Sequence, residues 1–305
     1  MCWPALSGPA AFVTTPQSAD ELQPSTVNTP NPDPQSWRAP TGLARYAGIY
    51  GAFLRNGLVR EMGFKINFIL WIFVELLWFA LQLAFMAVIY RHTERIASWT
   101  QWQVVLLVGT NHFIQQIFTA LFMNNCVKLS ENVRTGMLDF LLLMPVNARF
   151  LISLRHVDFG AFVNAGSAVA VMVYAARQLQ LTPSLPQLAG FSLLLLVGLS
   201  VHYSVMYILA CISFWTVRAQ GIVWGYYNLF QLARLPDEAF RGAFRAVFTY
   251  AVPVLLITNV PVKLLIDKLS SPLEIVWLVG LSAAVFVLSE VFWRWSVRHY
   301  GSASS

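Results

Sequence analysis

The chain of 305 residues is 57% hydrophobic and only 11% charged, and its formal net charge is +6. Soluble domains carry roughly 25% charged residues, so the composition excludes an ordinary soluble protein and predicts a membrane protein. The lysines and arginines stand singly at the ends of apolar runs and form no basic stripe, which excludes a nucleic-acid-binding protein. Cys2, Cys126 and Cys211 follow no CxxC or Cys/His spacing, and free thiols are expected.

The beginning of the chain differs in composition from the rest. Residues 1–40 hold more than half of the 15 prolines, separated by Ser, Thr, Asn and Gln. Such a segment buries too little apolar surface to offset the entropy lost on ordering, so a disordered tail is expected. It has no basic residue before Arg38 and no continuous apolar core, and it therefore does not fit a cleavable signal peptide. Residues 41–305 are expected to form a transmembrane domain.

Residues 43–65 have the pattern of a helix that lies in the membrane interface. The arginines of this segment fall mostly off its apolar face, and they are expected to point toward lipid headgroups. The apolar face is made by Tyr46, Ile49, Tyr50, Phe53 and Leu58.

Five apolar runs are predicted to cross the membrane. The first, residues 66–90, is long enough at about 1.5 Å per residue to span a hydrocarbon core of about 30 Å with some tilt. Trp and Tyr stand at several ends of the runs, where amphipathic rings prefer to sit. The five runs are residues 66–90, 104–126, 159–176, 188–215 and 275–295.

A sixth span is predicted between residues 217 and 271, but its position is ambiguous. Residues 217–235 are long enough to cross and carry three polar side chains, whereas residues 246–265 are more apolar and contain two prolines. The positive-inside rule favours the second segment, because Arg234, Arg241 and Arg245 then stay on the inner side. Both choices give six spans with both termini in the cytoplasm.

A charged stretch, residues 128–150, separates the second and third apolar runs. Its flanking lysines and arginines place it in the cytoplasm. A helix is predicted over residues 128–140, and it is expected to end before Pro145, because proline disfavours helical geometry in the preceding residue. The predicted apolar stripe is Leu129, Val133, Met137, Phe140 and Leu141, and the predicted polar face is Glu131, Asn132, Arg134 and Asp139.

Four stretches together resemble the membrane permease of a type-2 ATP-binding-cassette (ABC) transporter, a class made up mostly of exporters. They are ENVRTGMLDFLLLMPVNARF, NFILWIFVELLW, PVLLITNVPVKLL and the terminal HYGSASS. The resemblance runs from about residue 43 to residue 305. It implies that residues 43–65 are an interfacial connecting helix, that residues 217–235 are the fifth span, and that residues 236–265 dip in from the outer face. It also implies a coupling helix over residues 128–140, which contacts the ATPase subunit through Glu131, Arg134, Gly136, Leu138 and Asp139.

The sequence contains no GxxxxGK[ST] phosphate loop, so this chain is not expected to be an enzyme or to bind ATP or another cofactor. ATP hydrolysis is then expected in a separate ATP-binding-cassette subunit. Because six helices are few to enclose a path for a bulky cargo, a second permease subunit, identical or related, is also expected. The predicted location is the cytoplasmic (inner) membrane, where the chain contacts lipid and no nucleic acid.

Several polar residues fall inside the predicted spans. Glu75 and Gln82 share one face of the first span, and a charge at mid-membrane is expected to face protein or water. On the second span Asn111, Gln115 and Thr119 form a stripe that either lines a pathway or bonds neighbouring helices.

Three further polar residues are given structural roles. His202 is interpreted as a packing histidine whose hydrogen bonds are satisfied. Glu290 and Arg294, four residues apart on the last span, are interpreted as an ion pair on the helix surface with no role in transport.

Two other classes of protein remain as alternatives. A secondary transporter driven by an ion gradient is possible on the sequence, with Glu75 and His112 as a proton relay. A membrane scaffold that transports nothing is the other alternative. An intramembrane enzyme is disfavoured, because the sequence has no HExxH or GxSxG motif.

Overall fold

A computed structural model describes residues 42–216 and 219–301, and the predicted tail at residues 1–40 lies outside them. Contacts divide the chain into two units, residues 1–45 and 46–305. In the first unit, the Gly42 carbonyl accepts a hydrogen bond of 3.2 Å from the Arg45 N–H, in the opening turn of α1 (Leu43–Gly63). All regular structure in the described residues is helical, which confirms the predicted all-α class.

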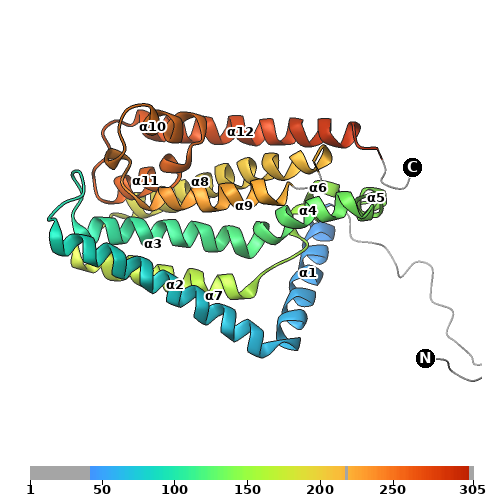
Figure 1. Cartoon of the computed structure of the whole chain (residues 1–305), viewed down its shortest axis with the longest axis horizontal. Helices are drawn as coiled ribbons and strands as arrows, with labels where there is room; N and C mark the ends of the chain where they lie inside the picture. Colours follow the sequence, from blue (N-terminus) through green and yellow to red (C-terminus); the bar gives the residue numbers. More distant parts are fainter. Residues whose placement is uncertain (1–41, 217–218, 302–305) are drawn as a thin grey trace, which may run out of the picture. The chain divides into compact units, whose positions relative to one another are not determined.

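Five helices are long and apolar enough to cross a membrane, or six if one bent pair counts as a span. The prediction of a polytopic membrane protein is therefore confirmed. Figure 1 shows these helices running side by side, with α1 lying across one end. The five are α2 (Lys65–His92), the helix from Gln101 to Arg134 that contains α3 (Gln101–Phe118), α7 (Phe159–Gln178), α8 (Leu185–Cys211, extended to Phe214) and α12 (Leu273–Arg298).

Helix α3 forms the interior of the second unit. Within its most apolar window 72% of the residues are buried, compared with 11% for α2. Gly109 lets α3 approach α7 closely, because a Cβ atom at this position would lie 2.9 Å from the Cγ atom of Met172. The outer face of α2 is therefore left for lipid or for another protein, while the polar residues of α3 are enclosed.

The ambiguous region between residues 217 and 271 folds as a series of short helices. The segment predicted to be the fifth span contains α9, which is only ten residues long, and the 3₁₀ turn η3. The rival segment is bent by 84° between residues 250 and 254. Which of the two segments crosses the membrane stays a prediction. The elements are α9 (Gln220–Leu229), η3 (Phe230–Arg234), η4 (Asp237–Ala239), α10 (Gly242–Ala246), η5 (Val247–Ala251) and α11 (Val254–Leu265).

The segment after the second span differs from its prediction. Instead of one helix over residues 128–140, the chain forms α4 (Asn124–Arg134) and α5 (Met137–Leu143), which are separated by Thr135 and Gly136. Gly136 adopts a left-handed φ of 70°, which glycine reaches without steric cost and which ends the first helix. Upstream, α4 is joined to α3 without a break through the π-helical turn η1 (Thr119–Met123).

The bundle has two distinct ends. The end that we call the α5 end carries α1, α4, α5, α6 (Ala148–Leu154) and the last turns of α12 (Figure 1). The opposite end, called the α10 end, carries α10 and the start of α12. A movement of α5 can therefore act directly only on the elements that share its end.

Candidate functional site

Helix α5 offers a surface outside the candidate spans. Phe140 of α5 is 65% exposed, and Met137 and Leu143 are also exposed. The predicted stripe was wrong for Met137 and Phe140, because the break at Gly136 starts a new helical register in α5. In this register Leu138 and Leu141 point inward and are buried.

The five predicted contact residues are not equivalent in the structure. Glu131 and Arg134 are exposed on the last turn of α4, and Gly136 and Asp139 are half-buried. Leu138 is fully buried and belongs to the hydrophobic core, so its role is to anchor α5. The exposed surface of residues 124–143, called the coupling segment below, therefore combines charges on α4 with apolar side chains on α5.

Helix α6 connects the coupling segment to α1. Its first turn is fixed by Asn147, whose side-chain Oδ1 accepts a hydrogen bond of 3.2 Å from the Phe150 N–H. The Phe150 ring meets the ring of Tyr46 edge-on at 4.9 Å between centroids, and it stacks on Phe53 at 6.3 Å. The Tyr46 hydroxyl also accepts from the Asn147 backbone N–H at 3.3 Å. Two aromatic contacts and one hydrogen bond thus hold α1 to α6.

On the other side of α6, Arg149 connects the same segment to α8 and α12. Its buried guanidinium donates to the Tyr203 hydroxyl of α8 at 3.3 Å and to the Ser289 hydroxyl of α12 at 2.7 Å. It also forms an ion pair with Glu290, and it lies 4.6 Å from the centroid of the Tyr207 ring. Burial alone would lower the pKa of Arg149, but Tyr203 and Glu290 hold this pKa above its ordinary value.

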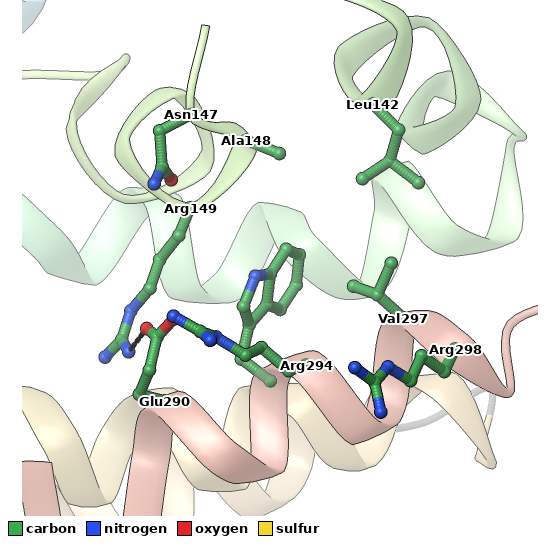
Figure 2. A pocket seen from close by; sticks show the side chains of 9 residues that line it. Leu142, Asn147, Ala148, Arg149, Glu290, Arg294, Val297 and Arg298 are labelled. Atoms are coloured by element: carbon green, nitrogen blue, oxygen red, sulfur yellow. Dashed lines mark hydrogen bonds and ion pairs between the residues drawn. The ribbon is translucent and has the colours of Figure 1, made fainter. Parts of the chain in front are cut away.

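Glu290 does more than the sequence predicted. The expected bond to Arg294 is present at 2.7 Å, but the other carboxylate oxygen of Glu290 accepts from Arg149. The predicted ion pair is therefore confirmed, but the contact with Arg149 was missed, because the prediction considered spacing within one helix only. Figure 2 shows Arg149 and Glu290 pointing toward each other from opposite sides of a cavity of about 380 Å³, which Leu142 and Arg298 also line.

The polar stripe on α3 is turned toward α9 and η3. The Asn111 amide donates to the Phe230 carbonyl at 3.4 Å, and the Gln231 amide donates to Gln115 at 2.9 Å. Thr119 and Tyr227 share a hydrogen bond of 3.3 Å between their hydroxyls. Each residue of the predicted stripe therefore bonds a neighbouring helix or turn.

Further polar residues lie on α2, α9 and η3, outside this stripe. Glu75 accepts a hydrogen bond of 3.3 Å from Gln116 of α3, while Asn228 of α9 is exposed. Gln82 and Arg234 line a cavity of about 280 Å³ together with three apolar side chains of α2. The four polar residues Glu75, Gln82, Asn228 and Arg234 are called the α2–α9 surface below. Many large apolar side chains of α2 and α9 are exposed.

The two histidines inside the spans make mainly aromatic contacts. His112 stacks on Phe79 at 3.9 Å between ring centroids, and no hydrogen bond joins it to Glu75 in the part of the chain that the structure describes. His202 is fully buried against Phe118 and Phe230. Its ring nitrogens were expected to be satisfied, but they have no hydrogen-bond partner among the described residues, because aromatic rings surround them.

Comparison with protein families identifies the family of this chain. A family model described as ABC-2 family transporter protein matches residues 76–304. The chain belongs to the ABC-2 family. No curated protein and no solved structure matches the chain significantly. The match contains the coupling segment, α6 and α12, so the Arg149–Glu290 pair lies within the part that defines this ABC-2 protein.

Membership of the ABC-2 family confirms the resemblance found in the sequence. The chain is a permease subunit of an ABC transporter and a multi-pass membrane protein. It associates with an ATP-binding-cassette ATPase subunit. Sequence reasoning predicted an ATPase contact over residues 128–140, which stays a prediction, and it missed Arg149, which it used only as a marker of membrane topology. Two features of the sequence point to Arg149. It stands beside Phe150 shortly after Pro145, and the last span contains a carboxylate, Glu290, that requires a partner.

Proposed function

We propose that this ABC-2 permease exports its cargo across the cytoplasmic membrane as a dimer, driven by a separate ATPase subunit that binds the coupling segment. The observation that carries this proposal is the exposure of Phe140 and its apolar neighbours beside the charges of Glu131 and Arg134. A mixed surface of this kind suits a protein partner, with apolar anchors for affinity and charges for orientation. ATP is bound by the partner, and this chain holds no cofactor.

The contacts around α6 support a mechanical route from the ATPase to the membrane. The coupling segment is continuous with α3, and Arg149 fastens α6 to both α8 and α12. Closure of two ATPase subunits on ATP would then move α3, α8 and α12 together. ATP drives this change because the closed ATPase dimer binds one permease conformation more tightly than the other.

The α2–α9 surface supports the dimer and the location of the pathway. A charged side chain at mid-membrane costs about 2.5–3.5 kcal/mol on insertion scales, so Glu75 and Arg234 are poorly suited to contact with lipid tails. A second permease subunit, identical or related, would cover this surface and enclose a polar path between the two copies. The positive-inside rule places the α5 end and both termini in the cytoplasm.

Co-purification with the ATPase tests the proposal. The permease is co-expressed with its ATP-binding-cassette subunit and is extracted in mild detergent. Arg134→Glu and Phe140→Asp should each release the ATPase while membrane insertion stays intact. Glu94→Arg is the matched control, because Glu94 is exposed in the loop at the α10 end. Retention of the ATPase by both coupling-segment variants, or labelling of residue 134 from outside the cell, contradicts the proposal.

A further inference from the structure

Arg234 differs from the other interior cations of this protein. It is half-buried at the end of η3 and lines the cavity of about 280 Å³ with Trp78, Leu81, Gln82 and Phe85 of α2. Neither the side chain of Arg234 nor that of Gln82 makes a hydrogen bond or an ion pair with any residue that the structure describes. The cavity thus brings two unpartnered polar groups together with three large apolar side chains.

The protein neutralises its buried cations elsewhere. Arg149 is paired with Glu290, and Lys263 lies 2.9 Å from Asp237 and 3.4 Å from Glu274. Arg234 has no such partner, although it faces the membrane-spanning part of α2. Trp78 and Phe85 lie roughly 21 and 10 Å from the His92 end of that helix, taking 1.5 Å per residue. An arginine held beside this stretch without a carboxylate partner among the described residues is suited to bind an anion from outside the chain.

We propose that Arg234 binds the anionic group of a single-chain amphipathic cargo, such as an alkyl carboxylate, phosphate or sulfate. This inference rests on the proposed function, because it assigns a cargo class to the α2–α9 surface. The planar guanidinium donates two parallel hydrogen bonds to such a group, and the Gln82 amide supplies a further donor. Trp78, Leu81 and Phe85 hold the apolar chain of the cargo.

A second copy of this chain is a poorer source of the anion. Helices α2, α3 and α9 contain a single carboxylate among them, Glu75. Glu75 already accepts a hydrogen bond from Gln116. The two carboxylates of α12, Glu274 and Glu290, are paired with Lys263 and Arg149. A dimer formed along the α2–α9 surface could therefore offer each Arg234 only one carboxylate from these helices, Glu75 of the other copy, and that group is already hydrogen-bonded to Gln116.

The binding experiment uses the purified permease alone, in nanodiscs of phosphatidylcholine. The probes are a bromine-labelled dodecanoic acid, studied as its carboxylate, and the bromine-labelled dodecanol of the same chain length. Bromine quenches tryptophan fluorescence, and the difference between the wild type and Trp78→Phe isolates the contribution of Trp78. The carboxylate should quench Trp78 at a concentration roughly tenfold or more below that of the alcohol, the scale of one charge-assisted contact.

Variants of Arg234 separate the charge from the rest of the cavity. Arg234→Gln should abolish the preference for the carboxylate, and Arg234→Lys should keep part of it. Arg241→Gln is the matched control, because Arg241 is exposed and lies outside the cavity. This substitution removes the same charge from the protein. Equal quenching by carboxylate and alcohol in the wild type, or an unchanged preference in Arg234→Gln, overturns the inference.

Two further outcomes address the source of the anion. Phosphatidylglycerol added to the nanodiscs should not displace the carboxylate probe; displacement assigns the cavity to bulk membrane lipid and overturns the cargo assignment. Dissociation of the dimer in Arg234→Gln, without carboxylate-dependent quenching in the wild type, assigns Arg234 to the subunit interface and also overturns it. The assay contains no ATPase, so it can succeed when the coupling proposal fails, and it can fail while Arg134→Glu still releases the ATPase.

Discussion

Arg149 of α6 and Glu290 of α12 form an ion pair although they are 141 residues apart in the sequence. This pair joins the loop after the second span directly to the last span. Since Arg149 also bonds Tyr203 and Ser289, three elements converge on one side chain. Removal of this arginine or of its acid should therefore affect both stability and the transmission of movement.

Glu290→Gln should destabilise the permease and uncouple ATP hydrolysis from transport. The substitution leaves the buried Arg149 without its charged partner, and a hydrogen bond to a charged group contributes about 1.5–3 kcal/mol. Thermal unfolding in detergent should shift downward, and the reconstituted complex should transport less cargo per ATP hydrolysed.

Arg294→Gln is the control for this prediction. Arg294 bonds the same carboxylate but its side chain is 70% exposed, so its loss should cost at most about 1 kcal/mol. Equal effects of the two substitutions, or normal transport per ATP in Glu290→Gln, would show that the Arg149 contact does not transmit movement.

Gly136→Ala should strain the coupling segment. The φ of 70° at this position costs a residue with a Cβ atom about 1–2 kcal/mol, and relief of the strain would change the direction of α5 relative to α4. Co-purification of the ATPase should fall while insertion in the membrane is unchanged. Gly136→Asn should be tolerated better, because asparagine adopts left-handed geometry more readily than alanine.

Gly166→Ala provides a matched glycine control on α7. Gly166 is exposed, and a Cβ atom added there meets no heavy atom within 4 Å. This substitution should leave ATPase binding unchanged and raise helix stability slightly. A similar loss of ATPase in both glycine variants would argue against a role for the left-handed turn.

The stability of the permease should depend on pH through His156. Burial and the nearby cations Lys128, Arg155 and Arg60 together lower the pKa of His156 to about 4. Because this pKa lies below the value of about 6.5 for an unfolded chain, the folded state favours the neutral ring. The stability contribution is therefore complete above pH 6.5 and is lost as the pH falls through 4.

Thermal unfolding between pH 7 and pH 4 measures this effect. His156→Gln should have a shallower loss of stability across that window than the wild type. His299→Gln is the control, because His299 is exposed at the end of α12 and should leave the wild-type slope unchanged. An identical slope in His156→Gln and the wild type would contradict the prediction.

Lys263→Met should strongly destabilise the α10 end. Lys263 is only 3% exposed and lies between the carboxylates of Asp237 and Glu274, so its removal leaves uncompensated negative charge. Breaking a buried pair in this way costs about 3–5 kcal/mol. Adding Asp237→Asn should restore part of the lost thermal stability, whereas Arg95→Met, at an exposed site in the neighbouring loop, should have little effect.

The spans were the part of the fold that the sequence predicted best. The run predicted at residues 66–90 became α2 (Lys65–His92), and the last run became α12 (Leu273–Arg298). A long run of apolar residues predicts a span reliably, because backbone groups in lipid must be satisfied within the helix itself. Short helices such as α9 and α11 were harder to predict, since the polar residues of this region and its prolines fit several arrangements.

The candidate site was predicted only in part. Thr135-Gly136 is a recognisable helix end, but the apolar stripe seemed to continue through it, and the register of α5 was therefore wrong. The contact of Arg149 with Glu290 depends on how α6 packs against α12, and spacing along one chain carries no information about that packing. The same holds for Arg234, whose lack of a partner is visible only in three dimensions.

The π-helical turn η1 lies within the helix that runs from Gln101 to Arg134. A π turn accommodates one extra residue, and one residue corresponds to about 100° of rotation in an α-helix. Conversion of this turn to α geometry would therefore twist everything from Asn124 onward about the helix axis. A movement transmitted along this helix can then include rotation about its axis as well as tilt.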